Sequence, residues 1–92
     1  MIEHKSTPTR GAFHYFEDGK EAGIMTYSKA GDDMIIIDHT EVFPEFNGKG
    51  IGKKLVLEGV KYARENNLKI IPLCPFASAL FKKTPEIRDV LA

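Results

Sequence analysis

A segment rich in glycine and lysine, Asn47–Lys54, is the part of the sequence best suited to chemistry. It reads Asn-Gly-Lys-Gly-Ile-Gly-Lys-Lys, with glycine at positions 48, 50 and 52 and no acidic residue. Glycine lets a backbone turn sharply and approach a ligand closely. The first N–H groups of a helix are unpaired and carry the positive end of its dipole, so they commonly bind phosphates. The segment therefore predicts a diphosphate-binding site with cationic lysines beside it.

A predicted strand and a predicted helix flank this segment and would hold it in place. Residues 34–42 begin with the apolar run Met-Ile-Ile-Ile, which is typical of a strand covered on both faces. Apolar residues then recur at helical spacing over residues 50–66. Phosphate sites occur where a strand, a glycine turn and a helix follow one another. The alternative is a glycine turn that only joins the two elements.

Two common phosphate-binding motifs do not fit these residues. A Walker A loop needs a glycine five residues before its Gly-Lys pair and Ser or Thr directly after it, but Asn47 and Lys54 occupy these positions. A dinucleotide-binding fingerprint fails because Lys53 or Leu55, depending on the register, stands where a small residue is required. Another kind of phosphate ligand must be considered.

The segment resembles the acetyl-CoA loop of the GNAT acetyltransferases, which usually runs Arg/Gln-x-x-Gly-x-Gly/Ala between a splayed strand and a long helix. Here residues 47–52 read Asn-Gly-Lys-Gly-Ile-Gly, after a similar lead-in at residues 42–46. Asn47 departs from the pattern, because it is shorter than Arg or Gln and uncharged. The resemblance implies acetyl-CoA (CoA) as the cofactor, with main-chain groups of the strand pairing with its pantetheine arm. The implied cofactor-binding residues are Thr40, Glu41, Val42, Asn47, Gly48, Lys49, Gly50, Ile51, Gly52, Lys53, Cys74 and Phe81.

The remaining sequence predicts an α/β (α+β) fold with a mixed sheet. An antiparallel N-terminal meander is followed by a β-α-β unit, whose two strands are parallel, and by a short C-terminal helix. The expected elements are a loose arm or short edge strand at 1–10, strands at 11–17, 20–28 and 34–42, a helix at 50–66, a strand at 69–73, a helix at 75–83 and a final turn or short helix at 85–91. This order resembles a minimal GNAT domain, and residues 1–92 are expected to form one such domain. The family's helices after the first strand are absent, because Asp18-Gly19 predicts a tight hairpin turn there.

The acid that should protonate the departing thiolate is not evident from the sequence. Many GNAT proteins carry Asn-x-x-Ala-x-x-x-Tyr after the last strand, and the phenol faces the thiol of CoA. Here Cys74, Ala77 and Phe81 occupy the three named positions. Phenylalanine cannot donate a proton, so another group acts, or transfer is slow, or the protein only binds its cofactor.

Cys74, His39 and Glu41 are the candidate catalytic residues. Cys74 precedes Pro75 and is expected to cap a helix, where thiols are activated as nucleophiles. An acetyl-cysteine intermediate, a thiol acting as the acid and simple core packing of Cys74 all remain open. His39 and Glu41 share one side of the strand, and either could accept the amine proton, His39 directly and Glu41 through a water. A half-buried structural role is the alternative for His39.

The composition limits the other functional classes. Lys and Arg number 13, as do Asp and Glu, so no overall positive charge favours nucleic acid. The three histidines lack metal-ligand spacing, and no metal is expected. The apolar runs are too short to span a membrane, and the single cysteine fits a reducing, cytoplasmic location.

The sequence thus predicts an acetyl-CoA-dependent GNAT-type N-acetyltransferase. Its expected acceptor is a small-molecule or peptide amine, which the sequence does not identify, and its expected state is a monomer or weak homodimer. One alternative is a non-catalytic acetyl-CoA/CoA-binding module. Another is a small interaction domain in which the glycine loop is only structural.

Overall fold

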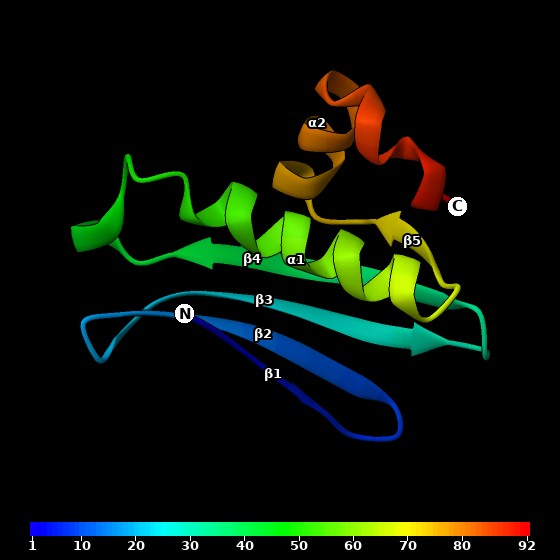
Figure 1. The fold of residues 1–92 in the computed structure, drawn as a ribbon, viewed down its shortest axis with the longest axis horizontal. Helices are drawn as coiled ribbons and strands as arrows, with labels where there is room; N and C mark the ends of the chain where they lie inside the picture. The colour runs from blue at the N-terminus through cyan, green and yellow to red at the C-terminus, as the bar shows by residue number, and fades with distance from the viewer.

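Helices pack against a five-stranded sheet in the computed structural model, which describes residues 1–92 (Figure 1). The strands are β1 (Ile2–Ser6), β2 (Arg10–Glu17), β3 (Lys20–Ala30), β4 (Met34–Val42) and β5 (Lys69–Pro72). The helices are α1 (Ile51–Glu65) and α2 (Pro75–Lys83), with short 3₁₀ helices η1 (Pro44–Phe46) and η2 (Pro85–Val90). The chain thus follows the element order expected from the sequence.

The sheet has the order β1-β2-β3-β4-β5, with antiparallel pairs from β1 to β4 and a parallel β4–β5 pair. This confirms the expected fold class: a meander, then a β-α-β unit. The expected N-terminal arm is an edge strand, β1, paired with β2. The ends of the other elements differ from expectation by at most two residues, as helix and strand ends commonly do. The predicted strand at 69–73 ends at Pro72, which has no N–H to continue the ladder.

The Asp18-Gly19 turn links β2 directly to β3. Both residues have positive φ, 51° at Asp18 and 80° at Gly19. Two consecutive positive φ values define the type I′ turn, whose twist matches that of the flanking strands. The hairpin therefore leaves no room for intervening helices, as the sequence predicted.

One side of α1 supplies much of the core. Its buried apolar residues include Ile51, Leu55, Val56 and Val60, spaced so that they share the face turned toward the sheet. They pack in one cluster of 19 buried residues with the inward side chains of the strands and with α2. Truncating a buried leucine such as Leu55 to alanine would cost about 2–5 kcal/mol of stability. This packing fixes α1, and hence its N-terminus, relative to β4.

Two features make β4 and β5 diverge. The β3–β4 register shifts where Thr26 pairs with His39 and Tyr27 with Ile37, so Asp38 is an extra, bulged residue that bends β4. The β4–β5 ladder ends at the Ile37–Pro72 pair, and the amides of Leu73 and Cys74 both donate to the Ile37 carbonyl at 3.1 Å. Because β4 continues to Val42, its last residues have no strand on the β5 side.

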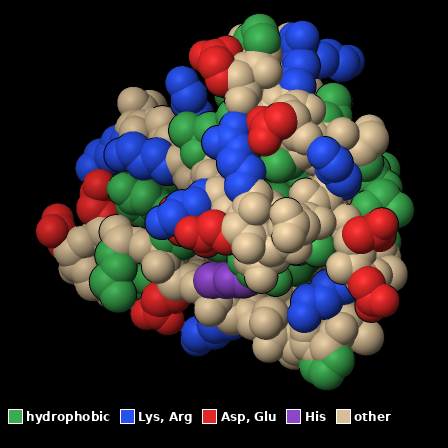
Figure 2. All heavy atoms as spheres, turned by 45° about the vertical axis from the view of Figure 1, so that its right-hand side comes forward, with side chains coloured by type: hydrophobic (Ala, Val, Ile, Leu, Met, Phe, Trp, Pro, Cys, Tyr) green, Lys and Arg blue, Asp and Glu red, His purple; other side chains and the backbone are tan.

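Neither helix combines the length and apolar character needed to cross a membrane. Basic and acidic side chains are interspersed over the face that Figure 2 presents. This distribution agrees with the equal numbers of basic and acidic residues, 13 of each. Any basic site must therefore be local.

Candidate functional site

The loop before α1 leaves a row of backbone amides free. Gly48 (φ 84°) and Gly50 (φ 73°) adopt left-handed conformations, which side chains with a Cβ resist. Gly50 caps α1, and its carbonyl accepts the first helical hydrogen bond, from the Lys54 amide at 3.1 Å. The amides of residues 51–53 therefore precede the first helical bond and have no partner within the helix. They form an anion site at the positive end of the helix dipole.

A cleft of about 530 Å³ lies between this loop and α2. Gly52 and Phe76 both line this cleft and pack closely, because a Cβ on Gly52 would lie 2.8 Å from the Phe76 ring. The glycine thus allows α2 to approach the start of α1. The cleft is lined by Val42, Phe46, Asn47, Gly48, Gly50, Ile51, Gly52, Lys53, Phe76, Ala79, Leu80, Lys83 and Thr84.

The three lysines of the loop have different surroundings. Lys49 Nζ donates to Glu17 Oε2 at 2.6 Å, and this hydrogen bond raises the pKa of Lys49. Lys54 Nζ lies 5.7 Å from the centroid of the Tyr15 ring. Lys53 lines the cleft and has no hydrogen-bond or ion-pair partner. Only Lys53 of the three is placed to meet a ligand without breaking an existing contact.

Cys74 faces Thr40 across the gap between the strands. Cys74 caps α2 as the sequence predicted, but its thiol makes no capping hydrogen bond. Instead its Sγ lies 3.5 Å from Thr40 Oγ1, within reach of a weak thiol hydrogen bond. The Cys74 side chain is buried in the core cluster. The gap that leaves β4 unpaired therefore brings a thiol beside the strand.

His39 and Glu41 do lie together, with His39 Nε2 3.4 Å from Glu41 Oε1. Both side chains are more than half exposed, at 62% and 52%. They pair across from Thr26 and Ile24 of β3, whereas Thr40 alternates to the side of Cys74. His39 and Glu41 thus lie on one face of β4, and the Cys74 thiol lies beside the opposite face.

A model of the GCN5-related N-acetyltransferase family matches residues 12–90. The chain belongs to this family. Acetyl-CoA is therefore the acetyl donor of this GCN5-related N-acetyltransferase, and the free amides, the cleft and the unpaired edge of β4 suit that molecule's diphosphate and pantetheine. A comparison with curated proteins gives no significant match.

Solved structures share the fold. A GCN5-like N-acetyltransferase candidate from Staphylococcus aureus is 37% identical, with a TM-score of 0.74, over 98% of this chain and 87% of its own. A ribosomal-protein-alanine N-acetyltransferase from Brucella melitensis is 22% identical, with a TM-score of 0.73, over 85% of this chain and 62% of its own. A candidate streptothricin acetyltransferase from Bacillus anthracis, in complex with acetyl coenzyme A, is 18% identical, with a TM-score of 0.65, over 85% of this chain and 47% of its own.

Within this GCN5-related N-acetyltransferase, most residues predicted around the loop line one cleft. The predicted residues that do not line it are Thr40, Glu41, Lys49, Cys74 and Phe81. Lys49 turns to Glu17, and Phe81 is 2% exposed inside the core. A contact between Phe81 and the cofactor stays a prediction, as do the roles of Thr40 and Glu41, whose side chains do not line the cleft.

Sequence reasoning missed the contribution of α2 to the cleft. Phe76, Ala79, Lys83 and Thr84 all line it, yet none belongs to the loop motif. The available signal was the helical spacing of Phe76, Ala79 and Lys83, which places them on one side of α2. The packing of Phe76 on Gly52, which turns that side toward the loop, could not be read from spacing.

Proposed function

We propose that this protein transfers the acetyl group of acetyl-CoA to an amine and that Cys74 assists the transfer. The observation that carries the proposal is the unpaired edge of β4 beyond Ile37. Val42 at its end lines the same cleft as the first residues of α1, and Thr40 contacts the thiol of Cys74. Acetyl-CoA supplies the activated acetyl thioester. The chain supplies its positioning and the groups that move protons.

The donor side is formed by backbone and small residues. Amides at the start of α1 hold the diphosphate, while Gly52 keeps α2 close without filling the cleft. Main-chain groups of Thr40, Glu41 and Val42 hydrogen-bond the pantetheine arm along the free edge. These backbone groups belong to a strand and a helix and are already fixed before binding. They therefore orient the thioester at little cost in conformational entropy.

Cys74 has two possible chemical roles at this edge. As a nucleophile, its sulfur bonds to the acetyl carbon while the thioester C–S bond breaks, and the thiol proton passes to the departing sulfur of CoA. The amine nitrogen then bonds to the acetyl carbon, the bond to Cys74 Sγ breaks, and an amine proton restores the thiol. As an acid, Cys74 only donates its proton to the departing thiolate, and the proton that the amine nitrogen loses then restores the thiol. The contact with Thr40 Oγ1 orients the thiol for either role.

The acceptor amine approaches from the face of β4 that carries His39 and Glu41. Their exposure lets a solvent-borne amine reach them, and either group accepts the proton that a protonated amine must lose before its nitrogen attacks the acetyl carbon. The names of two relatives given above indicate two acceptor classes, an alanine of a protein and a small molecule such as streptothricin. We infer an acceptor from one of these classes.

A non-catalytic acetyl-CoA-binding module is the second candidate, and Phe81 favours it. Phe81 is buried and carries no hydroxyl, so it cannot act where many GNAT proteins use a tyrosine. The two candidates share the donor cleft and differ only in turnover.

The deciding experiment incubates the protein with isotope-labelled acetyl-CoA and follows intact mass and release of free CoA. We expect CoA release that increases when peptides with free N-termini or small primary amines are added, and that falls sharply in Cys74→Ala. A labelled acetyl adduct in the wild type that is absent from Cys74→Ala supports the nucleophile role. CoA release that depends on Cys74, with no adduct, supports the acid role. Tight binding without any CoA release would favour the binding module.

A further inference from the structure

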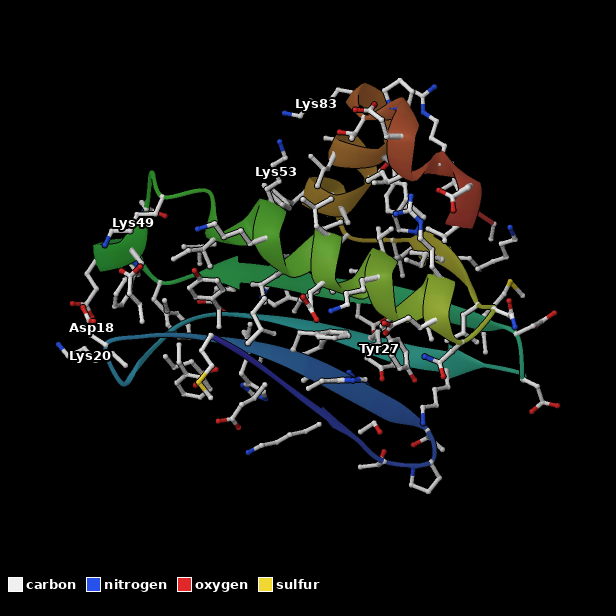
Figure 3. All side chains as sticks on the ribbon, viewed as in Figure 1. Asp18, Lys20, Tyr27, Lys49, Lys53 and Lys83 are labelled. Carbon is white, nitrogen blue, oxygen red and sulfur yellow. The ribbon has the colours of Figure 1, made fainter.

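Two lysines line the cleft without an electrostatic partner. Lys53 projects from the first turn of α1 and Lys83 from the last turn of α2, and both line the cleft between these helices. Neither takes part in a side-chain hydrogen bond, an ion pair or a cation–π contact in the structure. Figure 3 shows both side chains extending toward solvent above α1.

Other basic residues near the loop are already engaged. Glu17 holds Lys49, Tyr15 lies beneath Lys54, and Lys20 lies 3.9 Å from Glu45. No carboxylate lines the cleft, so Lys53 and Lys83 face it as uncompensated positive charges. Such an arrangement favours a ligand group that carries a negative charge of its own.

CoA carries two separate phosphate groups. The linear diphosphate suits backbone amides, which the start of α1 supplies. The ribose 3′-phosphate is a terminal dianion, and flexible lysine ammonium groups suit it as point charges. Phe76, with 45% of its surface exposed, gives the cleft an apolar wall near the same end of α1. The lysines on the two helices can therefore reach a phosphate beyond the diphosphate, at the adenosine end.

We propose that Lys53 and Lys83 bind the 3′-phosphate and make this protein select CoA over dephospho-CoA. The inference rests on the proposed use of the cleft for the acetyl donor. It adds that positive charge at the adenosine end favours CoA over dephospho-CoA, and that Lys83 of α2 contributes to this preference as much as Lys53 of the loop does. The site that reads the 3′-phosphate thus extends beyond the loop to Lys83 of α2.

The test compares calorimetric titrations of the protein with CoA and with dephospho-CoA. We expect CoA to bind about tenfold more tightly, a factor typical of hydrogen bonds to a charged group. Lys53→Gln and Lys83→Gln should each reduce this ratio. The double variant should bind the two ligands equally.

Matched controls remove a lysine from the same helices outside the cleft. Lys82→Gln changes the residue next to Lys83, and Lys61→Gln lies on α1; neither residue lines the cleft. Both should keep the wild-type ratio, and circular dichroism should show that all variants are folded. Equal binding of the two ligands by the wild type, or an undiminished ratio in the double variant, would overturn this inference alone. Binding of neither ligand would overturn the donor site itself.

Discussion

The two ends of α1 lie over regions that satisfy their polar groups in opposite ways. At the C-terminal end, His4 Nε2 lies 2.6 Å from the Tyr27 hydroxyl, and the His4 ring stacks on Phe13 with centroids 4.1 Å apart. Tyr62 packs edge-on against His4, which closes the cluster. At the N-terminal end, helix amides, an unpaired strand edge and two lysines have no partner in the chain. Figure 3 shows the separation, with Tyr27 at one end and Lys53 toward the other.

This difference indicates a division of labour along one helix. The aromatic cluster of His4, Phe13, Tyr27 and Tyr62 uses its contacts to stabilise the fold. The loop end keeps hydrogen-bonding capacity free, and a ligand can use it without displacing internal partners. Substitutions in the cluster should therefore lower stability and spare acetyl-CoA binding, whereas substitutions at the loop should weaken acetyl-CoA binding.

The largest effect is expected from Tyr27→Ala in the aromatic cluster. Tyr27 is fully buried, and replacing a buried aromatic residue with alanine costs about 3–5 kcal/mol of unfolding free energy. Urea denaturation measures this loss. Tyr27→Phe, which removes only the hydroxyl, should cost about 1 kcal/mol. A loss of acetyl-CoA affinity in folded Tyr27→Phe would contradict the division between the two ends.

A pair of glycine substitutions tests the loop directly. Gly50 and Gly31 both have positive φ, 73° and 70°, but only Gly50 lies at the cofactor loop. Gly50→Val and Gly31→Val should each lose about 1–2 kcal/mol of stability from left-handed strain. Only Gly50→Val should weaken acetyl-CoA binding, by about tenfold or more, because it disturbs the free amides. Calorimetric titration with acetyl-CoA measures the affinity of each variant. Equal affinity in both variants would argue against acetyl-CoA binding at the loop.

The aromatic cluster should also make stability depend on pH. Burial lowers the pKa of His4 below 6.5, Lys29 acts in the same direction, and Glu58 opposes them. Between the folded and unfolded pKa values the unfolded chain binds more protons, so acid favours unfolding. The His4 contribution should be complete above about pH 6.5 and should decrease as the pH falls through the folded pKa. Urea denaturation of wild type and His4→Phe between about pH 7.5 and about pH 5.5 measures it; parallel curves would exclude a role for His4.

The smallest effect concerns the tether between the loop and the β2–β3 hairpin. Glu17→Ala would release Lys49 from its 2.6 Å hydrogen bond. A free Lys49 adds positive charge beside the amides, so acetyl-CoA affinity should rise by about two- to threefold at low salt. Titrations at low and high ionic strength should show the gain only at low salt. Weaker binding would mean that the tether holds the loop in its binding conformation.

Patterns within single elements predicted the fold and the loop. The alternation in β2 and β3, the Asp18-Gly19 turn and the spacing of apolar residues in α1 are local signals, and each is confirmed. What depends on contacts between distant segments was not predictable from spacing. The pairing of Lys49 with Glu17, the contact of Cys74 with Thr40 and the contribution of Lys83 to the cleft all join residues far apart in sequence.

Titration of ¹⁵N-labelled protein with acetyl-CoA, followed by NMR, tests the central claim most directly. The amides of residues 50–53 and of residues 40–42 should shift in a saturable manner, while those of His4 and Tyr27 should remain in place. Saturating acetyl-CoA that leaves the first two groups unmoved, or that shifts only the aromatic cluster, would contradict a donor site formed by the start of α1 and the free edge of β4.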